Sequence, residues 1–338
     1  MMEILKNKEE WNNFLIRMES YDLYHTFEYH EVVKKTGEEP ILITYKNNNT
    51  EIGFPFLKRK INNELSDLIS VHGYLGPVSI NVDDSFDSNN FSKEFLKLLQ
   101  MEKIVSAFSK LNPYLSNQSK ALAKLGTIEN VGELVYFDQQ MDVNDQILCY
   151  KKDTIRLIKK LKPISSYRMA TNSEDIEAFM EIYYSNLDRL NANKSFYYKK
   201  DYFNSLLNSD MADANIILAI HNETNEIMAG VFYFGTKHIS HIELACTNDK
   251  YYNISPVRYL YDQIRELCHK DEMNYLDMGG GSGGRQGSLM KFKSCFAQNY
   301  VDFNIWKLIA MPDEYDELQT LDQKNADSNF FPKYRLNL

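Results

Sequence analysis

Apolar residues recur at helical spacing behind an asparagine at two places in the chain. The segment NKEEWNNFLIRM begins at Asn7, and NSEDIEAFMEIY begins at Asn172. In both, two acidic residues stand two and three positions after the asparagine, and apolar residues then come three and four positions apart. This is the pattern of an amphipathic helix with an N-cap, so we predict a helix at each place.

Each predicted helix is followed by two apolar runs that are separated by an asparagine-rich turn. PILITYKNNNTEIGFPFLKRK begins at Pro40, and NIILAIHNETNEIMAGVFYF begins at Asn215. Such runs predict β hairpins. In the first half a glycine-proline loop, the helix FSKEFLKLLQMEK and the strand IVSAFSK follow. The second half continues with a strand, a helix and a further strand, which are HISHIELACT, VRYLYDQIRELCHK and NYLDMGG. One order of elements therefore occurs twice.

The repeat predicts an α/β protein with two copies of one unit, each a mixed sheet flanked by helices. We place the first domain at residues 1–150 and the second at 151–310, and we expect the tail, 311–338, to pack back on the first domain. Between the copies lies KKDTIRLIKKLKP, with six basic residues and one acidic residue. It is either a solvated linker helix or a patch that attracts anions.

Composition narrows the choice of partners. The chain has 338 residues, a net charge of −9 and a pI of about 5.4, which argues against DNA or RNA as the main partner. Its four cysteines lack the spacing of a metal site, so we expect reduced thiols and no metal. No apolar run approaches the ~20 residues of a membrane span, and no signal peptide is evident, so we expect a cytoplasmic protein.

Six of the fourteen glycines lie in one stretch, LDMGGGSGGRQGSLMKFKSCF, at residues 276–296. A G-x-G-x-x-G pattern starts at Gly279, but a dinucleotide site also needs a helix at the glycines and an acid ending the next strand. Here the helix can begin only near Ser288, and Asp302 opens the next strand. The stretch is therefore either a flexible surface loop or a loop that lets a substrate lie close to the backbone.

This order of elements resembles the acyltransferase unit of the GNAT superfamily, and two units in tandem resemble its FemABX branch. The most specific segments are YLDMGGGSGGRQGSLMKFKSCF and ACTNDKYYNISPVRYLYDQIRE. YHTFEYHEVVKKTGEEP, YLGPV, LDRLNANKSFYYKKDYF and RLIKKLKP are also similar. The resemblance covers nearly the whole chain. It implies two tandem GNAT-like domains, with the acceptor bound by the first and the acyl donor by the second.

The resemblance also implies roles for residues of the donor side. Phe292 and Lys293 match a pair that lines the donor channel, and the lysine supports the charged transition state. Backbone N–H groups of Leu244, Ala245 and Cys246 would stabilise the oxyanion. We expect the loop NDKYYNISPVR to face the pyrophosphate of coenzyme A, with donor-binding residues at three positions: Tyr252, Ser255 and Arg258.

The strand HISHIEL offers candidates for the base. His241 and Glu243 alternate onto one face, so that one removes the amine proton or both hold the acceptor. A histidine here is also commonly structural, and water alone can accept the proton. His25 and His30 are weaker candidates.

On the acceptor side, His72 lies on a glycine-containing loop of the first domain. The family resemblance adds Tyr74, Asn112, Arg189 and Tyr202. Asn112 stands where family members that accept a peptidoglycan precursor have aspartate, and Ile242 and Leu244 replace a pair of aromatic residues. These differences weigh against a peptidoglycan acceptor.

We therefore expect an N-acyltransferase that uses a coenzyme A thioester as co-substrate and holds no permanent cofactor. The acceptor would be the amine of a nucleotide-linked amino sugar for surface polysaccharide, with a dTDP-3-amino-3,6-dideoxyhexose and a 3-hydroxybutyryl donor implied by the resemblance. Two alternatives remain. One is an aminoacyl-tRNA-dependent transferase of peptidoglycan bridges, which the acidic pI disfavours. The other is a non-catalytic binding protein on the same duplicated fold.

Overall fold

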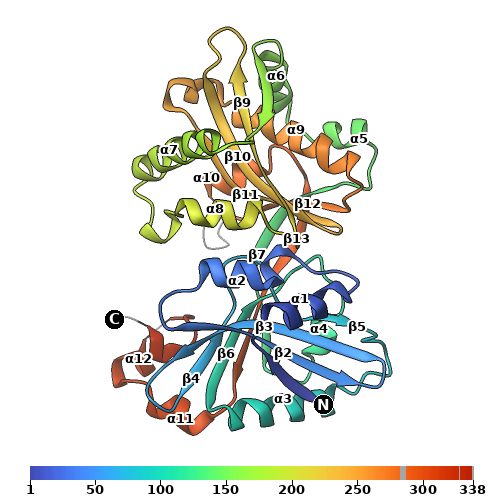
Figure 1. Cartoon of the computed structure of the whole chain (residues 1–338), viewed down its shortest axis with the longest axis vertical. Helices are drawn as coiled ribbons and strands as arrows, with labels where there is room; N and C mark the ends of the chain where they lie inside the picture. The colour runs from blue at the N-terminus through green and yellow to red at the C-terminus, as the bar shows by residue number, and fades with distance from the viewer. Residues whose placement is uncertain (282–286, 327, 337–338) are drawn as a thin grey trace. The chain divides into compact units, whose positions relative to one another are not determined.

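The computed structural model describes residues 1–281, 287–326 and 328–336. The chain forms two compact units. Unit 1 consists of Met1–Val131 together with Phe303–Leu338, and unit 2 is Gly132–Asp302. Figure 1 labels the helices and strands of both. In the described part of the chain, no helix has both the length and the apolar composition needed to cross a bilayer.

The main sheet of unit 1 has six strands side by side, and one pair of neighbouring strands is parallel. All neighbours run antiparallel except β4 and β6, which are parallel and joined through helix α3 (Ser88–Met101). A short strand, β5 (Val78–Ile80), pairs with β3. The strand order is β1 (Met2–Leu5), β2 (Glu38–Asn47), β3 (Thr50–Lys60), β4 (Ser66–Ile69), β6 (Ile104–Lys110) and β13 (Asn299–Ile309).

The sheet of unit 2 repeats this plan. Its parallel pair is β11 and β12, joined through the 3₁₀ turn η3 (Asp249–Ile254) and helix α9 (Val257–Lys270). All other neighbours are antiparallel. The strand order is β8 (Ser165–Met169), β9 (Asp213–His221), β10 (Ile227–Thr236), β11 (Ile239–Thr247), β12 (Tyr275–Gly279) and β7 (Thr127–Asp138).

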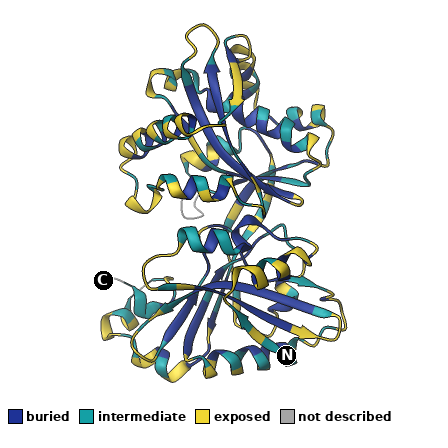
Figure 2. Ribbon diagram, in the orientation of Figure 1, coloured by how far each residue is buried: buried dark blue, intermediate teal, exposed yellow. Residues whose placement is uncertain are grey.

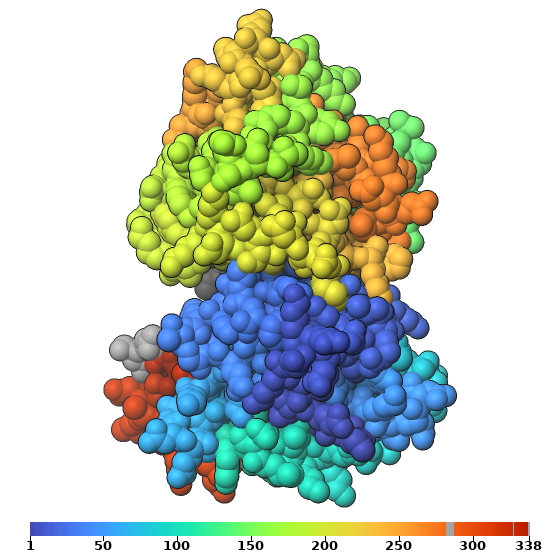
Figure 3. All heavy atoms as spheres, in the orientation of Figure 1, coloured from blue at the N-terminus to red at the C-terminus, as the bar shows by residue number. Residues whose placement is uncertain are grey.

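Helices cover both faces of the unit 2 sheet. Helix α7 (Ser173–Arg189) contacts β10 and β11, and Gly230 leaves the space that the ring of Phe179 occupies. Atoms of α7 and α8 (Lys200–Leu207) cover the near side of this sheet in Figure 3. Alternate residues of the same strands, such as Val231, pack with α9 and α6 (Lys152–Leu161) on the other face. Strands β9 to β11 are accordingly buried in Figure 2.

The remaining helices are short or lie at the surface. The predicted caps at Asn7 and Asn172 both form, since each side chain accepts hydrogen bonds from backbone N–H groups of its helix. The other elements are α1 (Lys8–Ile16), η1 (Leu23–His25), α2 (Phe27–Val33), α4 (Gln118–Ala121), α5 (Val143–Leu148), η2 (Lys194–Phe196), α10 (Ser288–Lys293), α11 (Pro312–Glu317), α12 (Leu321–Asn325) and η5 (Lys333–Arg335).

The last strand of each repeat belongs to the sheet of the other unit. Strand β7 ends the first repeat, yet its residues 135–138 pair with β12 of unit 2. Strand β13 ends the second repeat, yet its residues 305–309 pair with β6 of unit 1, where Trp306 is fully buried. The unit boundaries consequently fall at 131/132 and 302/303 rather than at 150 and 310. The tail belongs to unit 1, where Tyr334 hydrogen-bonds to Ser106 and Asp67.

Two histidines that the sequence offered as weak candidates for the base are buried in unit 1. Burial lowers the pKa of His25 to about 4 and that of His30 to about 3. The unfolded chain, with ordinary histidine pKa values near 6.5, binds more protons in this range, so stability falls as the pH drops from about 6.5 to about 4.

We expect His30→Phe to reduce this acid sensitivity. Removing one titrating group lowers the slope of unfolding free energy against pH by up to about 1.4 kcal/mol per pH unit below pH 6.5. Urea titrations between pH 4 and pH 7 measure the slope. His238→Gln, at an exposed position, is the control and leaves it unchanged. An unchanged slope in His30→Phe would contradict the assignment.

Candidate active site

Strands β11 and β12 pair over only three residues and then separate. Ile239, Ser240 and His241 face Tyr275, Leu276 and Asp277 in parallel register. Strand β11 continues to Thr247, and among the described residues no strand pairs with it on that side beyond His241. Just beyond the last pair, Ile242 lies opposite Tyr233 and Leu244 opposite Phe232, so that Glu243 is the extra residue of a β-bulge. Bulges of this kind redirect side chains and are frequent beside active sites.

His241 and Asp277 form a buried pair where the two strands separate. His241 Nδ1 and Asp277 Oδ2 are 3.2 Å apart, and both residues are almost fully buried. The imidazole ring also packs against the ring of Phe234 at 5.1 Å. A carboxylate beside Nδ1 fixes the orientation and the tautomer of an imidazole.

Lys293 follows the glycine-rich stretch in the sequence, and its ammonium group interacts with the charge of Asp277. It is the last residue of α10, and its Nζ donates to the carbonyl oxygen of Gly280 at 3.0 Å. Burial lowers the pKa of Lys293 to about 8, although the charges of Asp277 and Glu243 act to raise it. An ammonium group with this pKa can give up its proton near neutral pH.

The charge of Glu243 also acts on two tyrosines. Burial raises the phenol pKa of Tyr183 and Tyr198, and the charge of Glu243 raises both further. The charges of Asp277 and Glu243 both act on Lys293, and Asp277 contacts His241, which relates the predicted residues Lys293, His241 and Glu243 to one another. The structure adds Asp277 and these tyrosines, which the sequence analysis did not identify.

A signal for Asp277 was present in the sequence. An acidic residue in the middle of the apolar strand NYLDM, with buried Leu276 and Met278 on either side, is costly unless it has a partner. Tyr198 had no comparable signal, because its position follows from the fold of the loop before α8.

The donor loop ends at the start of α9. Ser255 has a left-handed backbone (φ 53°), and Pro256 is the N-cap, with no side-chain capping bond among the described residues. The N–H groups of Arg258 and Tyr259 donate to the carbonyl oxygens of Ser255 and Pro256, and the positive end of the helix dipole still favours a phosphate there. Tyr252 is exposed and lies under the guanidinium of Arg189 at 4.5 Å, and Arg189 also pairs with Asp249. Arg189, expected on the acceptor side, therefore contacts the donor loop.

Other predicted donor residues take part in packing. Arg258 donates to Thr154 Oγ1 at 2.9 Å and lies over the ring of Phe292 at 4.8 Å, so its guanidinium is held by side chains of unit 2. Phe292 packs with Tyr261 and Phe296 in the core.

The strand residues of the donor side differ in exposure. Leu244 is half-buried and Ala245 exposed, whereas Cys246 is buried and its thiol pKa is raised by burial. A buried thiol with a raised pKa is a poor nucleophile. Any role of these three residues would use their backbone.

The predicted acceptor residues do not form one cluster within a unit. Tyr202 is a core residue of unit 2, stacked on Tyr198 at 4.1 Å. Asn112 is buried in unit 1 and donates to Asp22 at 2.7 Å, which is a structural role. Tyr74 packs on neighbouring rings, and His72 is exposed on its loop. Residues 282–286 of the glycine-rich stretch lie outside the described residues, and so does the predicted course of that loop.

Comparisons with known proteins bear on the fold of the chain. Residues 151–293 match the family model described as an acetyltransferase (GNAT) domain. No curated protein matches the sequence. FemX is similar in structure, with a TM-score of 0.73 at 10% identity, over 93% of this chain and 99% of FemX. A C-terminal DUF2156 domain from Agrobacterium fabrum is similar with a TM-score of 0.58 at 12% identity, over 91% of this chain and 95% of that one. A conserved protein of unknown function from Bacteroides thetaiotaomicron is similar with a TM-score of 0.56 at 11% identity, over 91% of this chain and 100% of that one.

The predicted fold class is confirmed, since the chain is an α/β protein with mixed sheets flanked by helices in a GNAT-like arrangement. The separated strands, the bulge and the start of α9 all lie in the matched segment. Residues 151–293 match the model of an acetyltransferase (GNAT) domain, which supports an acyltransferase, and the chain is similar to FemX in fold.

Proposed function

We propose that the protein transfers an acyl group from a coenzyme A thioester to the amine of a nucleotide-linked amino sugar. The observation that carries the proposal is the grouping of Lys293, Glu243 and the His241–Asp277 pair where β11 and β12 separate. A GNAT domain implies acyl-coenzyme A as co-substrate. In this proposal the thioester lies where β11 and β12 separate.

The proposed donor site follows the open strand edge and the start of α9. The pyrophosphate of coenzyme A would lie beside the start of α9, where the positive end of the helix dipole favours an anion. The thioester carbonyl would accept from backbone N–H groups of residues 244–246. Donors held in place before the reaction lower the barrier to the tetrahedral intermediate by a few kcal/mol.

In the proposed reaction Glu243 accepts the proton of the acceptor ammonium group. The neutral nitrogen then attacks the thioester carbon and a C–N bond forms. The C–S bond breaks, and the nitrogen gives its second proton to solvent water. Lys293 would donate a proton to the leaving thiolate, because its pKa of about 8 is close to that of a thiol. His241 would keep the carboxylate of Asp277 in place, so that its negative charge stays near Lys293.

The acceptor is assigned by chemistry and by the sequence resemblance. His72 on its exposed loop is our candidate for contacting it. The replacement of an acceptor-binding aspartate by Asn112 disfavours a peptidoglycan precursor, and the resemblance to enzymes of dTDP-linked 3-amino-3,6-dideoxyhexoses supports an amino sugar.

A second candidate is transfer of an amino acid from aminoacyl-tRNA to a peptidoglycan precursor. The similarity to FemX extends over 93% of the chain and supports this candidate at least as well. The net charge of −9 counts against tRNA as a partner. The absorbance of the purified protein at 260 nm separates the two candidates cheaply, because retained tRNA would show there.

Isothermal titration calorimetry tests the proposed function directly. We expect binding of coenzyme A in the micromolar range, and tighter binding of dTDP than of UDP. Failure to bind coenzyme A, together with a preference for UDP, would overturn the acyl-coenzyme A proposal and favour the tRNA-dependent reaction.

We expect Glu243→Gln to lower kcat by about 10²- to 10⁴-fold, because the amine loses its proton acceptor. The loss should shrink as the pH rises, since more of the acceptor amine is then neutral in solution. Acyl transfer measured by thiol release between pH 6.5 and 9.5 gives both results. Glu272→Gln, at an exposed position of unit 2, is the control. A loss that is the same at every pH would exclude Glu243 as the base.

A further inference from the structure

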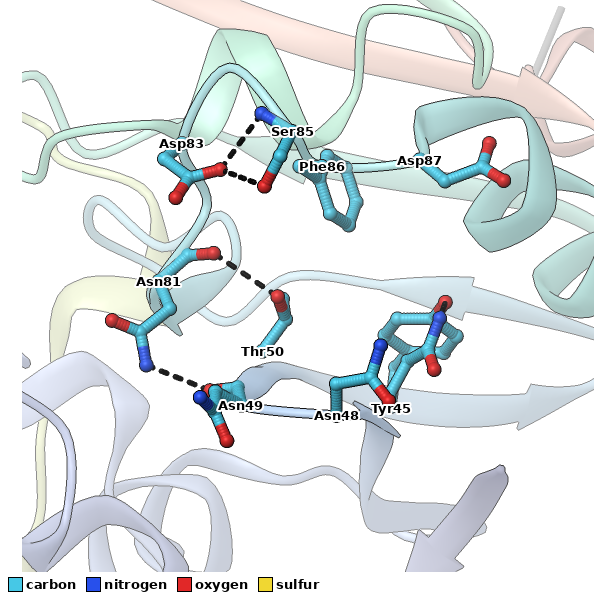
Figure 4. A pocket seen from close by; sticks show the side chains of 10 residues that line it. Tyr45, Asn48, Asn49, Thr50, Asn81, Asp83, Ser85, Phe86 and Asp87 are labelled. Carbon is cyan, nitrogen blue, oxygen red and sulfur yellow. Dashed lines mark hydrogen bonds between the residues drawn. The ribbon is translucent and has the colours of Figure 1, made fainter.

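Unit 1 contains a cavity of about 510 Å³ that shares no residue with the site in unit 2. One wall is the turn between β2 and β3, residues 47–50. The other is the segment that leads from β5 to α3, between Asn81 and Asp87. Figure 4 shows the side chains that line it. A cavity of this size is within the usual range for small-molecule sites.

Hydrogen bonds between the walls hold the cavity in shape. Thr50 Oγ1 donates to the carbonyl oxygen of Asn81 at 3.0 Å, and Asn81 Nδ2 donates to the carbonyl oxygen of Asn49 at 2.7 Å (Figure 4). Asn48 and Asn81 both have left-handed backbones, with φ of 51° and 56°. Asparagine tolerates this conformation better than most residues. A preformed site of this kind costs a ligand less ordering entropy.

The lining offers unused hydrogen-bond acceptors. Asp83 Oδ1 accepts from the backbone N–H and the hydroxyl of Ser85, and Asp87 Oδ1 caps α3 by accepting from the N–H of Asn90. Within the described residues, the second oxygen of each carboxylate accepts no hydrogen bond. The amide side chains of the turn add further donors and acceptors.

Tyr45 supplies a buried donor. Tyr45 is 2% exposed, and its hydroxyl oxygen accepts hydrogen bonds from the side-chain amides of Asn47 at 3.2 Å and Asn90 at 3.1 Å. With both amides donating, the hydroxyl's own proton finds no acceptor among the residues that the structure describes. A buried donor without an acceptor on the wall of a cavity suits a ligand oxygen.

The charge and shape of the lining select the ligand class. It includes two carboxylates and no lysine or arginine, so a phosphate or another anion is disfavoured. Phe86 presents an aromatic ring that contacts Phe91 at 5.9 Å. A sugar ring carries many hydroxyl groups at its edge and an apolar C–H face that can pack on such a ring.

We propose that unit 1 binds a neutral or amine-bearing saccharide in this cavity. The hydroxyl groups would donate to Asp83 and Asp87 and accept from Tyr45, and the C–H face would lie against Phe86. The site goes beyond the proposed function and does not rest on it, because its residues bind a sugar whatever group unit 2 transfers.

Saturation-transfer difference NMR on the full chain tests the proposal with three probes. We expect D-glucosamine and N-acetyl-D-glucosamine to give saturable signals, with dissociation constants on the order of 1 mM for so small a ligand in an open site. D-glucosamine 6-phosphate should bind at least about tenfold more weakly, because the carboxylates repel its phosphate.

Matched variants locate the binding. Asp83→Ala and Phe86→Ala should each weaken binding by at least about tenfold. Asp84→Ala is the control, since this acid pairs with Lys120 and does not line the cavity. Glu243→Gln, in unit 2, should bind the probes as the unaltered chain does. The proposal is overturned if neither unphosphorylated sugar gives a saturable signal, or if binding survives in Asp83→Ala and Phe86→Ala, or if it is lost in Glu243→Gln.

Discussion

Lys293→Ala should lower kcat by about 10²- to 10³-fold while leaving the dissociation constant for coenzyme A nearly unchanged. The buried ammonium acts only once charge develops on the departing sulfur, so its loss raises the barrier by an amount typical of a removed transition-state donor. The unaltered enzyme should also lose activity as the pH rises through about 8, because deprotonated Lys293 has no proton to give.

Initial rates of thiol release over pH 6.5–9.5, with calorimetry for coenzyme A, measure this prediction. Lys291→Ala is the matched control, because Lys291 lies on the same helix but is exposed. In Lys293→Ala the decline near pH 8 should disappear along with most of the rate. If Lys293→Ala and Lys291→Ala had similar rates, Lys293 would have no part in the chemistry.

Asp262→Ala should lower the free energy of unfolding by about 3–5 kcal/mol, the largest stability effect that we predict. Asp262 is buried in unit 2 and accepts from the fully buried guanidinium of Arg265 and from the hydroxyl of Tyr150. Removing the carboxylate leaves a charged guanidinium inside the protein. Its remaining partners are neutral groups such as the Gln146 side chain, and one half-exposed carboxylate, that of Glu266, at 3.4 Å.

Urea denaturation followed by circular dichroism checks this value. Asp153→Ala is the control, because Asp153 pairs with Arg156 on the exposed surface of α6, and such pairs contribute about 0.5 kcal/mol or less. A loss of under about 1 kcal/mol in Asp262→Ala would show that water or a rearranged Glu266 satisfies Arg265.

Much of the fold follows from local sequence. The caps at Asn7 and Asn172, both hairpins and the helix beginning at Ser288 were predictable, because capping, turn and periodicity signals act within a few residues. The partners of β7 and β13 were not. Pairing between strands more than a hundred residues apart depends on which edge is free in the folded unit, and no local pattern carries that information.

The candidate site divides in the same way. Alternation placed His241 and Glu243 on one face of a strand, and the structure brings both close to Asp277 or Lys293. The role of Asp277 depends on the parallel register between β11 and β12, which sequence spacing does not reveal. Asn112 and Tyr202 were assigned by resemblance, and both are buried, so their accessibility could not be predicted from the matched positions alone.

The strand β13 also affects how the protein emerges from the ribosome. Unit 1 needs Trp306 in its core and β13 beside β6, but these residues are synthesised only after all of unit 2. At about 5–20 residues per second, the first 131 residues wait about 10–35 s for their last strand. During that interval the edge of β6 stays unpaired and can pair with another nascent chain. Strand β7 is synthesised before the rest of unit 2, so unit 2 is complete earlier and can fold first, although unit 1 begins earlier in the sequence.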